Sequence, residues 1–167
     1  MFVNNIERDK DFDFAKELYL VRRRLEKRIA KQQINGFYVC SLSFESIIYK
    51  GLFLAEQLSI FYPDLANEEF ISSFAVFHQR YSTNTFPSWG LAQPFRLLAH
   101  NGEINTISGN TNWMRNHQTR ITTEIFGDDS EQVKPIIEKN VSDSSALDAA
   151  FELYVRAGRS VPLVKTL

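Results

Sequence analysis

Three short polar clusters hold the residues of this sequence that could do chemistry. Asn101-Gly102 offers a side-chain amide N–H and a backbone N–H, which are two donors suited to a developing oxyanion. Gly102 also lacks a Cβ, which leaves room for close approach. Arg80 offers a planar fork for a carboxylate, and Asp143 offers a carboxylate for an ammonium group. Together these groups complement a free amino acid and an amide carbonyl under attack.

Each cluster also has an ordinary structural interpretation. Asn-Gly between two apolar arms is a common hairpin signal, so Asn101-Gly102 is predicted to be a strand-to-strand turn. Arg80 at a strand end could be a surface ion-pair partner, and Asp143 before a helix is an ordinary N-cap. The turn and the donor pair are compatible, because a turn can present both N–H groups.

The histidines and tryptophans are assigned structural roles. Imidazole titrates near neutral pH, but a histidine in a hairpin arm is more often structural, which is the prediction for His78 and His100. No spacing pairs two of His78, His100 and His117 on one helix face, so no metal site is predicted. Trp89 and Trp113 are predicted to be buried aromatics that shape a pocket wall.

Helices and β-rich segments must position these clusters. Asp13 leads a helix with its arginines mostly on a solvated face. The opposite, apolar face carries residues that recur every three or four positions: Phe14, Leu18, Val21, Leu25 and Ile29. A helix is predicted from about Ser108 to Arg120, and another, capped by residues 142–145 and with Leu147 on its core face, closes near Gly158. Between them the sequence predicts a hairpin of FYVCSLSF and IIYKGLF, a short helix within residues 54–70, a strand at FISSFAVFHQRYS, a hairpin at PFRLLAHNGEI and a loop from Gly127 to Lys134. This order predicts an α+β fold.

Composition bounds the classes of partner. The 167 residues carry 19 basic and 20 acidic side chains, so no general attraction to nucleic acid or membrane is predicted. Arg22, Arg23, Arg24 and Arg28 remain the candidate for an RNA contact. Cys40, the single cysteine, excludes an internal disulfide and any multi-cysteine metal site within the chain, and a packing role is favoured for it. With no signal peptide and no long apolar run, a cytoplasmic location is expected.

The stretch FHQRYSTNTFPSWGLAQPFRLLAHNGEINTISGNTNWMRNH, residues 77–117, closely resembles the class II glutamine amidotransferase domain at the amino end of the glutamate synthase large subunit. The later SDSSALD follows in the family's order, and the likeness extends back through FYVCSLS and YKGLF. The resemblance implies part of an N-terminal-nucleophile hydrolase αββα sandwich, in which antiparallel sheets lie between helical layers. Residues 1–160 would be an internal portion of that single domain, and residues 161–167 a divergent tail.

The resemblance also implies roles for particular residues. Arg80 would bind the α-carboxylate of L-glutamine, and Thr83 would line the same pocket. Asn101 and Gly102 would form the oxyanion hole, and Asp143 would take the α-ammonium. It gives neither His78 nor His100 a general-base role, and it assigns no metal or cofactor ligand in this chain.

One element of the family's chemistry is not found in this sequence. The family's nucleophile is a cysteine at the first position of the mature chain, whose own α-amine acts as base. This sequence begins Met1-Phe2-Val3, and Cys40 has no free amine. We therefore expect an internal piece of the domain that is inactive alone, and that aggregates or folds only partly because sheet edges and apolar faces are uncovered.

For the whole protein, the resemblance implies hydrolysis of glutamine through a glutamyl-thioester. The ammonia would then serve the reductive amination of 2-oxoglutarate at a distant site that uses flavin mononucleotide (FMN) and an iron–sulfur cluster. The implied partners are L-glutamine, the remainder of the large subunit and, optionally, a small electron-donating subunit, with no nucleic acid and no membrane. The alternative is a non-catalytic amino-acid-binding or regulatory module that uses Arg80, Thr83 and Asp143 as a sensor.

Overall fold

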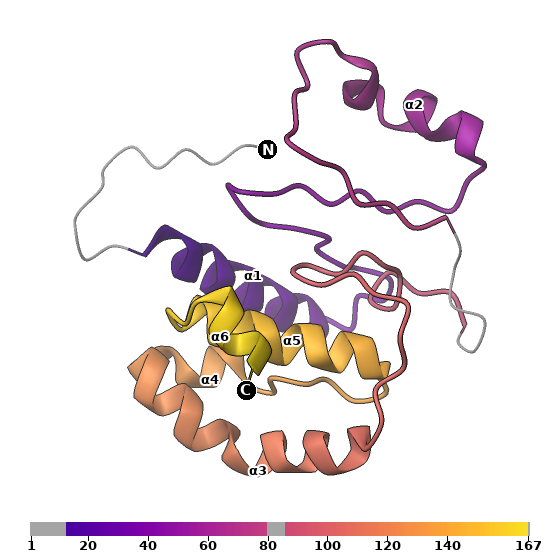
Figure 1. Cartoon of the computed structure of the whole chain (residues 1–167). Coiled ribbons are helices and arrows are strands. Elements are labelled where there is room, and N and C mark those ends of the chain that lie inside the picture. Colours follow the sequence, from indigo (N-terminus) through magenta and orange to yellow (C-terminus); the bar gives the residue numbers. More distant parts are fainter. Residues whose placement is uncertain (1–12, 80–85, 167) are drawn as a thin grey trace.

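The fold is given by a computed structural model that describes residues 13–79 and 86–166 (Figure 1). The helices, in chain order, are α1 (Phe14–Lys31), α2 (Leu58–Phe61), α3 (Ile107–Phe126), α4 (Ser130–Val133), α5 (Asp143–Arg156) and α6 (Val161–Thr166). Single 3-10 turns lie at Ala55–Gln57, Pro63–Ala66 and Gly127–Asp129. None of the helices in these ranges is long and apolar enough to cross a membrane.

The ends of α1 follow from local signals in the sequence. The Asp13 carboxylate caps the helix by accepting the backbone N–H of Lys16 at 3.1 Å. Glu17 in the first turn and Arg28 and Lys31 in the last turn complement the helix dipole. The predicted helix led by Asp13 is therefore confirmed.

The buried face of α1 differs from the predicted one. Val21 and Leu25 of the expected apolar stripe are exposed, whereas Arg22 is only 3 % exposed and Arg23 is also buried. The reason is pairing across the fold: Arg22 donates to Glu152 of α5 at 2.5 Å, so its charge is buried with a partner. The prediction of a solvated face was wrong for Arg22 and Arg23, whereas Arg24 and Arg28 are exposed as expected. A run of arginines in the sequence does not reveal its partners.

Helices α3 and α5 were predicted more closely than the segment between them. The Ser142 hydroxyl caps α5 by accepting the Ser145 N–H at 3.1 Å, and Gly158 follows the end of this helix with a φ of 87°. The predicted loop from Gly127 to Lys134 instead contains a 3-10 turn and α4. Burial explains this difference, because Val133 is fully buried and α4 packs against α1 and α3.

The hydrophobic core lies between α1, α3, α4 and α5. Tyr19 of α1 packs its ring 5.8 Å from that of Phe126 of α3, and Leu153 of α5 is fully buried. Leu147 was predicted to belong to this core but is exposed. The core residues are Tyr19, Leu20, Met114, Phe126, Val133, Ile136, Ile137, Ala146 and Leu153. Helix α5, which begins at the candidate residue Asp143, is therefore fixed by packing on three other helices, α1, α3 and α6 (Figure 1).

The predicted strands and hairpins are not formed within residues 13–79 and 86–166. The β-rich segments 37–53 and 67–79 run without ladder hydrogen bonds, and apolar side chains such as Leu52 and Ile71 are exposed. A strand is stable only when a neighbour pairs with its backbone and a layer covers its apolar face. The described part of the chain supplies neither a pairing neighbour nor a covering layer for these segments, so β propensity alone did not decide the local structure.

Candidate active site

Asn101 and Gly102 lie in an exposed segment that leads directly into α3. Neither residue has a positive φ, whereas a two-residue Asn-Gly hairpin turn needs positive φ at both positions. The left-handed residue is instead Thr106, the N-cap of α3, with a φ of 58°. The predicted strand-to-strand turn is therefore wrong, and the arm after Gly102 is directed toward α3 rather than back along the arm before Asn101.

The side chain of Asn101 has a partner that fixes its amide. His78 Nε2 lies 3.1 Å from Asn101 Oδ1. When Nε2 carries the ring proton, it donates to the amide oxygen, and the Nδ2 hydrogens of Asn101 are then left to donate to another group. This is the orientation that an oxyanion donor needs, and it gives His78 a partner that sequence reasoning did not find.

Asp143 is joined to the same segment by a hydrogen bond. It lies in the first turn of α5, and its Oδ2 accepts the backbone N–H of Ile104 at 2.8 Å. Its Oδ1 accepts the N–H of Ser144 at 2.6 Å. Burial pushes the pKa of Asp143 upward, but the N–H groups of Ile104 and Ser144 outweigh it and hold that pKa below its ordinary value. The carboxylate is therefore ionised at neutral pH, as an ammonium partner must be.

The structure thus brings three of the five predicted site residues into one region. Asn101 and Gly102 lie two to three residues before Ile104, which contacts Asp143. The other two, Arg80 and Thr83, lie outside the described residues.

Two positioning groups were not singled out from the sequence. Gln93 forms a double contact with the backbone of His100: its Nε2 donates to the His100 carbonyl at 2.6 Å, and its Oε1 accepts the His100 N–H at 2.8 Å. Asp148 of α5 accepts three backbone N–H groups of the same segment. A signal for Asp148 was present, because it is an acidic residue on the buried face of a predicted helix.

The basic and aromatic groups beside this segment are structural. Lys50 is buried, and its ammonium donates to the carbonyls of Trp89 at 2.9 Å and Ala92 at 2.7 Å. Burial lowers the pKa of Lys50 to about 8. Trp89 and Trp113 are both exposed, so the prediction that they are buried aromatics was wrong. Trp113 instead stacks on His117 of the same helix, with ring centroids 4.3 Å apart.

Potential metal ligands do not gather in the part of the chain that the structure describes. No group of three or more His, Cys, Asp or Glu side chains there could hold a metal ion. Cys40 is half-buried and is the chain's single cysteine. These residues do not fit an iron–sulfur cluster, which is held by several thiolates.

Residues 1–166 match the family of class-II glutamine amidotransferases. The chain therefore belongs to this family of enzymes, which are N-terminal-nucleophile hydrolases of the α+β class. It is 58 % identical over its whole length to the glutamate synthase [NADPH] large chain of Azospirillum brasilense. It is 48 % identical over 149 residues to the glutamate synthase [NADPH] large chain of Bacillus subtilis (strain 168), and these cover 89 % of the chain. It is 45 % identical over 161 residues, or 96 % of the chain, to the chloroplastic ferredoxin-dependent glutamate synthase of Spinacia oleracea.

The chain covers only a small part of the length of each relative. The chain spans 11 % of the length of the Azospirillum brasilense relative and 10 % of the other two. About nine-tenths of each relative therefore lies outside the region that matches this chain.

Proposed function

We propose that this chain supplies the substrate-binding and oxyanion-stabilising part of a glutamine-hydrolysing site in a glutamate synthase. The observation that carries the proposal is the 2.8 Å hydrogen bond between Asp143 and Ile104. It joins the candidate ammonium-binding carboxylate to the segment that holds the donors Asn101 and Gly102, in a chain of the class-II amidotransferase family.

The proposed chemistry is acyl transfer from the side-chain amide of L-glutamine. A cysteine thiolate attacks the amide carbon, and the carbonyl π electrons move to the oxygen, which becomes an oxyanion. Asn101 Nδ2–H and Gly102 N–H donate to that oxygen as its charge develops. When the intermediate collapses, the C–N bond breaks, and the nitrogen takes up the proton that the thiol gave to the α-amine base and leaves as ammonia. Water then hydrolyses the thioester to glutamate and regenerates the thiol.

Recognition of the amino-acid end of the substrate falls to charged groups. Asp143 would accept from the α-ammonium, since its carboxylate is ionised and only partly covered. Arg80 would bind the α-carboxylate through its planar fork, and Thr83 would line the same pocket.

The nucleophile has to come from outside these residues. Cys40 is the single cysteine of the chain, and its nitrogen lies in a peptide bond, so it offers no α-amine to act as its base. We therefore propose that the chain by itself does not turn over glutamine.

The β-rich segments would become strands of the sandwich once neighbouring strands pair with them. Segments 37–53 and 67–79 and the arms around Asn101 carry β-rich sequence, and many of their apolar side chains are exposed. An exposed apolar face on an extended segment is what a second layer would cover. This supports an αββα arrangement in the complete domain.

The remainder of the whole protein would use the ammonia. FMN and an iron–sulfur cluster would bind there, together with 2-oxoglutarate, which the ammonia would aminate, and, where present, a small electron-donating subunit. The cytoplasm is the compartment that we propose, because the single cysteine gives no sign of an oxidising one.

A hybrid protein tests this function. The 167 residues would replace the aligned segment of the Azospirillum brasilense large chain, and ammonia release from L-glutamine would be measured. We expect activity, and we expect Asp143→Asn to raise KM about tenfold to a hundredfold, because a hydrogen bond to a charged group contributes about 1.5–3 kcal/mol. With 4-carbamoylbutanoate, which lacks the α-amine, Asp143→Asn should change KM little.

Asp129→Asn is the matched control, because Asp129 lies at the surface with Arg24. An equal loss with both substrates would contradict the ammonium contact. Absence of ammonia release from the hybrid would contradict the proposed function, and tight glutamine binding by the separate 167-residue chain would favour the non-catalytic binding module.

A further inference from the structure

We propose that Asp148 is a positioning residue, whose carboxylate fixes the backbone of residues 96–98 and thereby places the oxyanion donors Asn101 and Gly102. This inference rests on the proposed function and extends it to a residue that does not touch the substrate. Asp148 lies in α5, and the segment that it holds is about fifty residues earlier in the chain.

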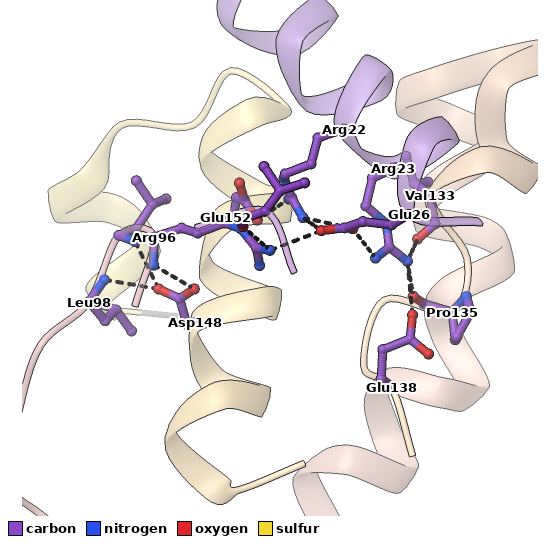
Figure 2. A network of polar contacts seen from close by, with 12 residues as sticks. Arg22, Arg23, Glu26, Arg96, Leu98, Val133, Pro135, Glu138, Asp148 and Glu152 are labelled. Atoms are coloured by element: carbon purple, nitrogen blue, oxygen red, sulfur yellow. Dashed lines mark hydrogen bonds and ion pairs between the residues drawn. The ribbon is translucent and has the colours of Figure 1, made fainter. Parts of the chain in front are cut away.

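The contacts of Asp148 are made with three consecutive N–H groups. Asp148 Oδ2 accepts from Arg96 at 3.2 Å, and Oδ1 accepts from Leu97 at 2.9 Å and from Leu98 at 2.9 Å. Figure 2 shows the carboxylate directed from α5 toward this stretch of backbone. A carboxylate that accepts several N–H groups fixes position and orientation of the peptide planes together, because each bond has its own direction.

The Asp148 carboxylate is buried, and burial disfavours its ionised form. Asp148 is 3 % exposed, and burial raises its pKa above the ordinary value even though the three N–H groups oppose this. A buried carboxylate without such donors would be strongly destabilising. The three N–H donors therefore account for a carboxylate on the core side of α5.

The held segment is secured on its other sides as well. The Arg96 guanidinium donates to Glu26 of α1 at 2.9 Å, so residue 96 is fixed by α5 through its backbone and by α1 through its side chain. The Gln93 amide pairs with the backbone of His100, and Phe95 N–H donates to the Leu98 carbonyl at 2.8 Å. Asp148 therefore binds a segment, residues 93–100, whose backbone is already closed by hydrogen bonds of its own.

This geometry leaves the donor pair between two anchors of the same helix. Asp148 holds residues 96–98 before the pair, and Asp143 holds Ile104 after it. Only residues 99–103 lie between these anchors. Since α5 is fixed in the core, the position of Asn101 and Gly102 follows from that of α5, as a preorganised oxyanion hole requires.

The kinetic test uses Asp148→Ala and Asp148→Asn in the hybrid described above. We expect Asp148→Ala to lower kcat about a hundredfold with KM changed less than about twofold, because displacing catalytic groups by about 1 Å has effects of that size. Asp148→Asn should recover part of kcat, since its amide oxygen can still accept from Leu97 and Leu98.

Glu152→Gln is the matched control. Glu152 is also buried on α5, but it pairs with Arg22 rather than with the loop. It should lower the melting temperature and leave kcat within about twofold, since its contact lies away from the donors. An equal fall in kcat for Glu152→Gln and Asp148→Ala, or no fall for Asp148→Ala, would overturn the proposal.

Amide hydrogen exchange separates this inference from the proposed function. In the hybrid, the N–H groups of Leu97 and Leu98 should exchange at least about tenfold faster in Asp148→Ala, while those of α3 keep their protection. Unchanged exchange at residues 97 and 98 would overturn the anchoring even if the hybrid is active. If exchange is faster but the unsubstituted hybrid is inactive, Asp148 does anchor residues 97 and 98, but there is no catalytic site for it to position. That outcome would also overturn the positioning role.

Discussion

The backbone conformation at position 102 does not require glycine, whereas the proposed chemistry does. The φ of Gly102 is not positive, and a Cβ added there would meet His100 Nδ1 at 3.7 Å, which is ordinary contact. The fold therefore has no requirement for glycine at this position, and the requirement that remains is room for a substrate beside the backbone N–H.

Gly102→Ala should therefore affect turnover and not stability. We expect the free energy of unfolding of the 167-residue chain to change by less than about 0.5 kcal/mol, as at other unstrained surface sites. In the hybrid, kcat for ammonia release should fall about tenfold, because the new methyl group crowds the oxyanion donor. Urea denaturation and ammonia assays measure the two effects.

Gly109→Ala is the control for this substitution. Gly109 lies in α3 with open space around its Cβ position, so alanine there should raise stability slightly and leave kcat unchanged. A kcat for Gly102→Ala equal to that of the unsubstituted hybrid would show that no substrate approaches this backbone.

At the level of single residues, residue types and the family motif indicated the candidate site but did not predict the contacts of its side chains. The donor pair and Asp143 were named from residue type and family motif, and the structure joins Asp143 to that segment. The contacts of His78 with Asn101 and of Asp148 with Leu97 were not predictable, since they join residues 23 and 51 positions apart. Neighbours of this kind are set by the three-dimensional fold and have no local pattern.

At the scale of elements, the helices were predictable because their signals are local. Asp13 and Ser142 cap α1 and α5 as the sequence indicated, and each cap acts within three residues. The faces of α1 and the strands were not predictable, because both depend on partners. The buried Arg22 pairs with Glu152 of another helix. A strand likewise needs a neighbour, and the local sequence does not supply one.

Glu26 links α1 to the segment that precedes the donor pair. Its carboxylate pairs with Arg22 at 2.9 Å, Arg23 at 3.2 Å and Arg96 at 2.9 Å (Figure 2). Burial raises the pKa of Glu26, yet the guanidinium groups of Arg22, Arg96 and Arg23 outweigh it and hold that pKa below its ordinary value of 4.5.

This lowered pKa predicts a defined pH dependence. Because the folded chain favours ionised Glu26, its contribution to stability is present above pH 4.5 and is lost as the pH falls through the lower, folded-state pKa. Glu26→Gln should reduce the free energy of unfolding at pH 7 by on the order of 3 kcal/mol, as expected when one partner of a largely buried ion pair is removed. The difference from the unsubstituted chain should shrink toward pH 3.

Urea denaturation at pH 7, 5 and 3 measures this effect. Glu124→Gln provides the control, since its pair with Arg120 is exposed and should contribute little at any pH. A Glu26→Gln difference that stays constant between pH 7 and pH 3 would contradict the electrostatic account of this network.

At the scale of the whole molecule, helical packing is complete on one side of the chain and apolar surface is open on the other. The core joins α1, α3, α4 and α5, whereas Phe74, Phe77 and Phe86, which lie outside the helices, are each more than three-quarters exposed. Such a surface is typical of one that another layer covers. The chain also spans only about a tenth of its glutamate synthase relatives, so its function is best tested within a complete large chain.

Asn101 is proposed to supply an oxyanion donor to a glutamine-hydrolysing site. The most direct measurement is the steady-state rate of ammonia release by the hybrid with Asn101→Ala, beside Asn116→Ala on the exposed part of α3 as control. We predict that Asn101→Ala lowers kcat about a hundredfold to a thousandfold with little change in KM, as loss of an oxyanion donor does. The control should retain full activity. A kcat for Asn101→Ala within about twofold of the unsubstituted hybrid would contradict this role of Asn101, because a missing oxyanion donor cannot leave the transition state equally stable.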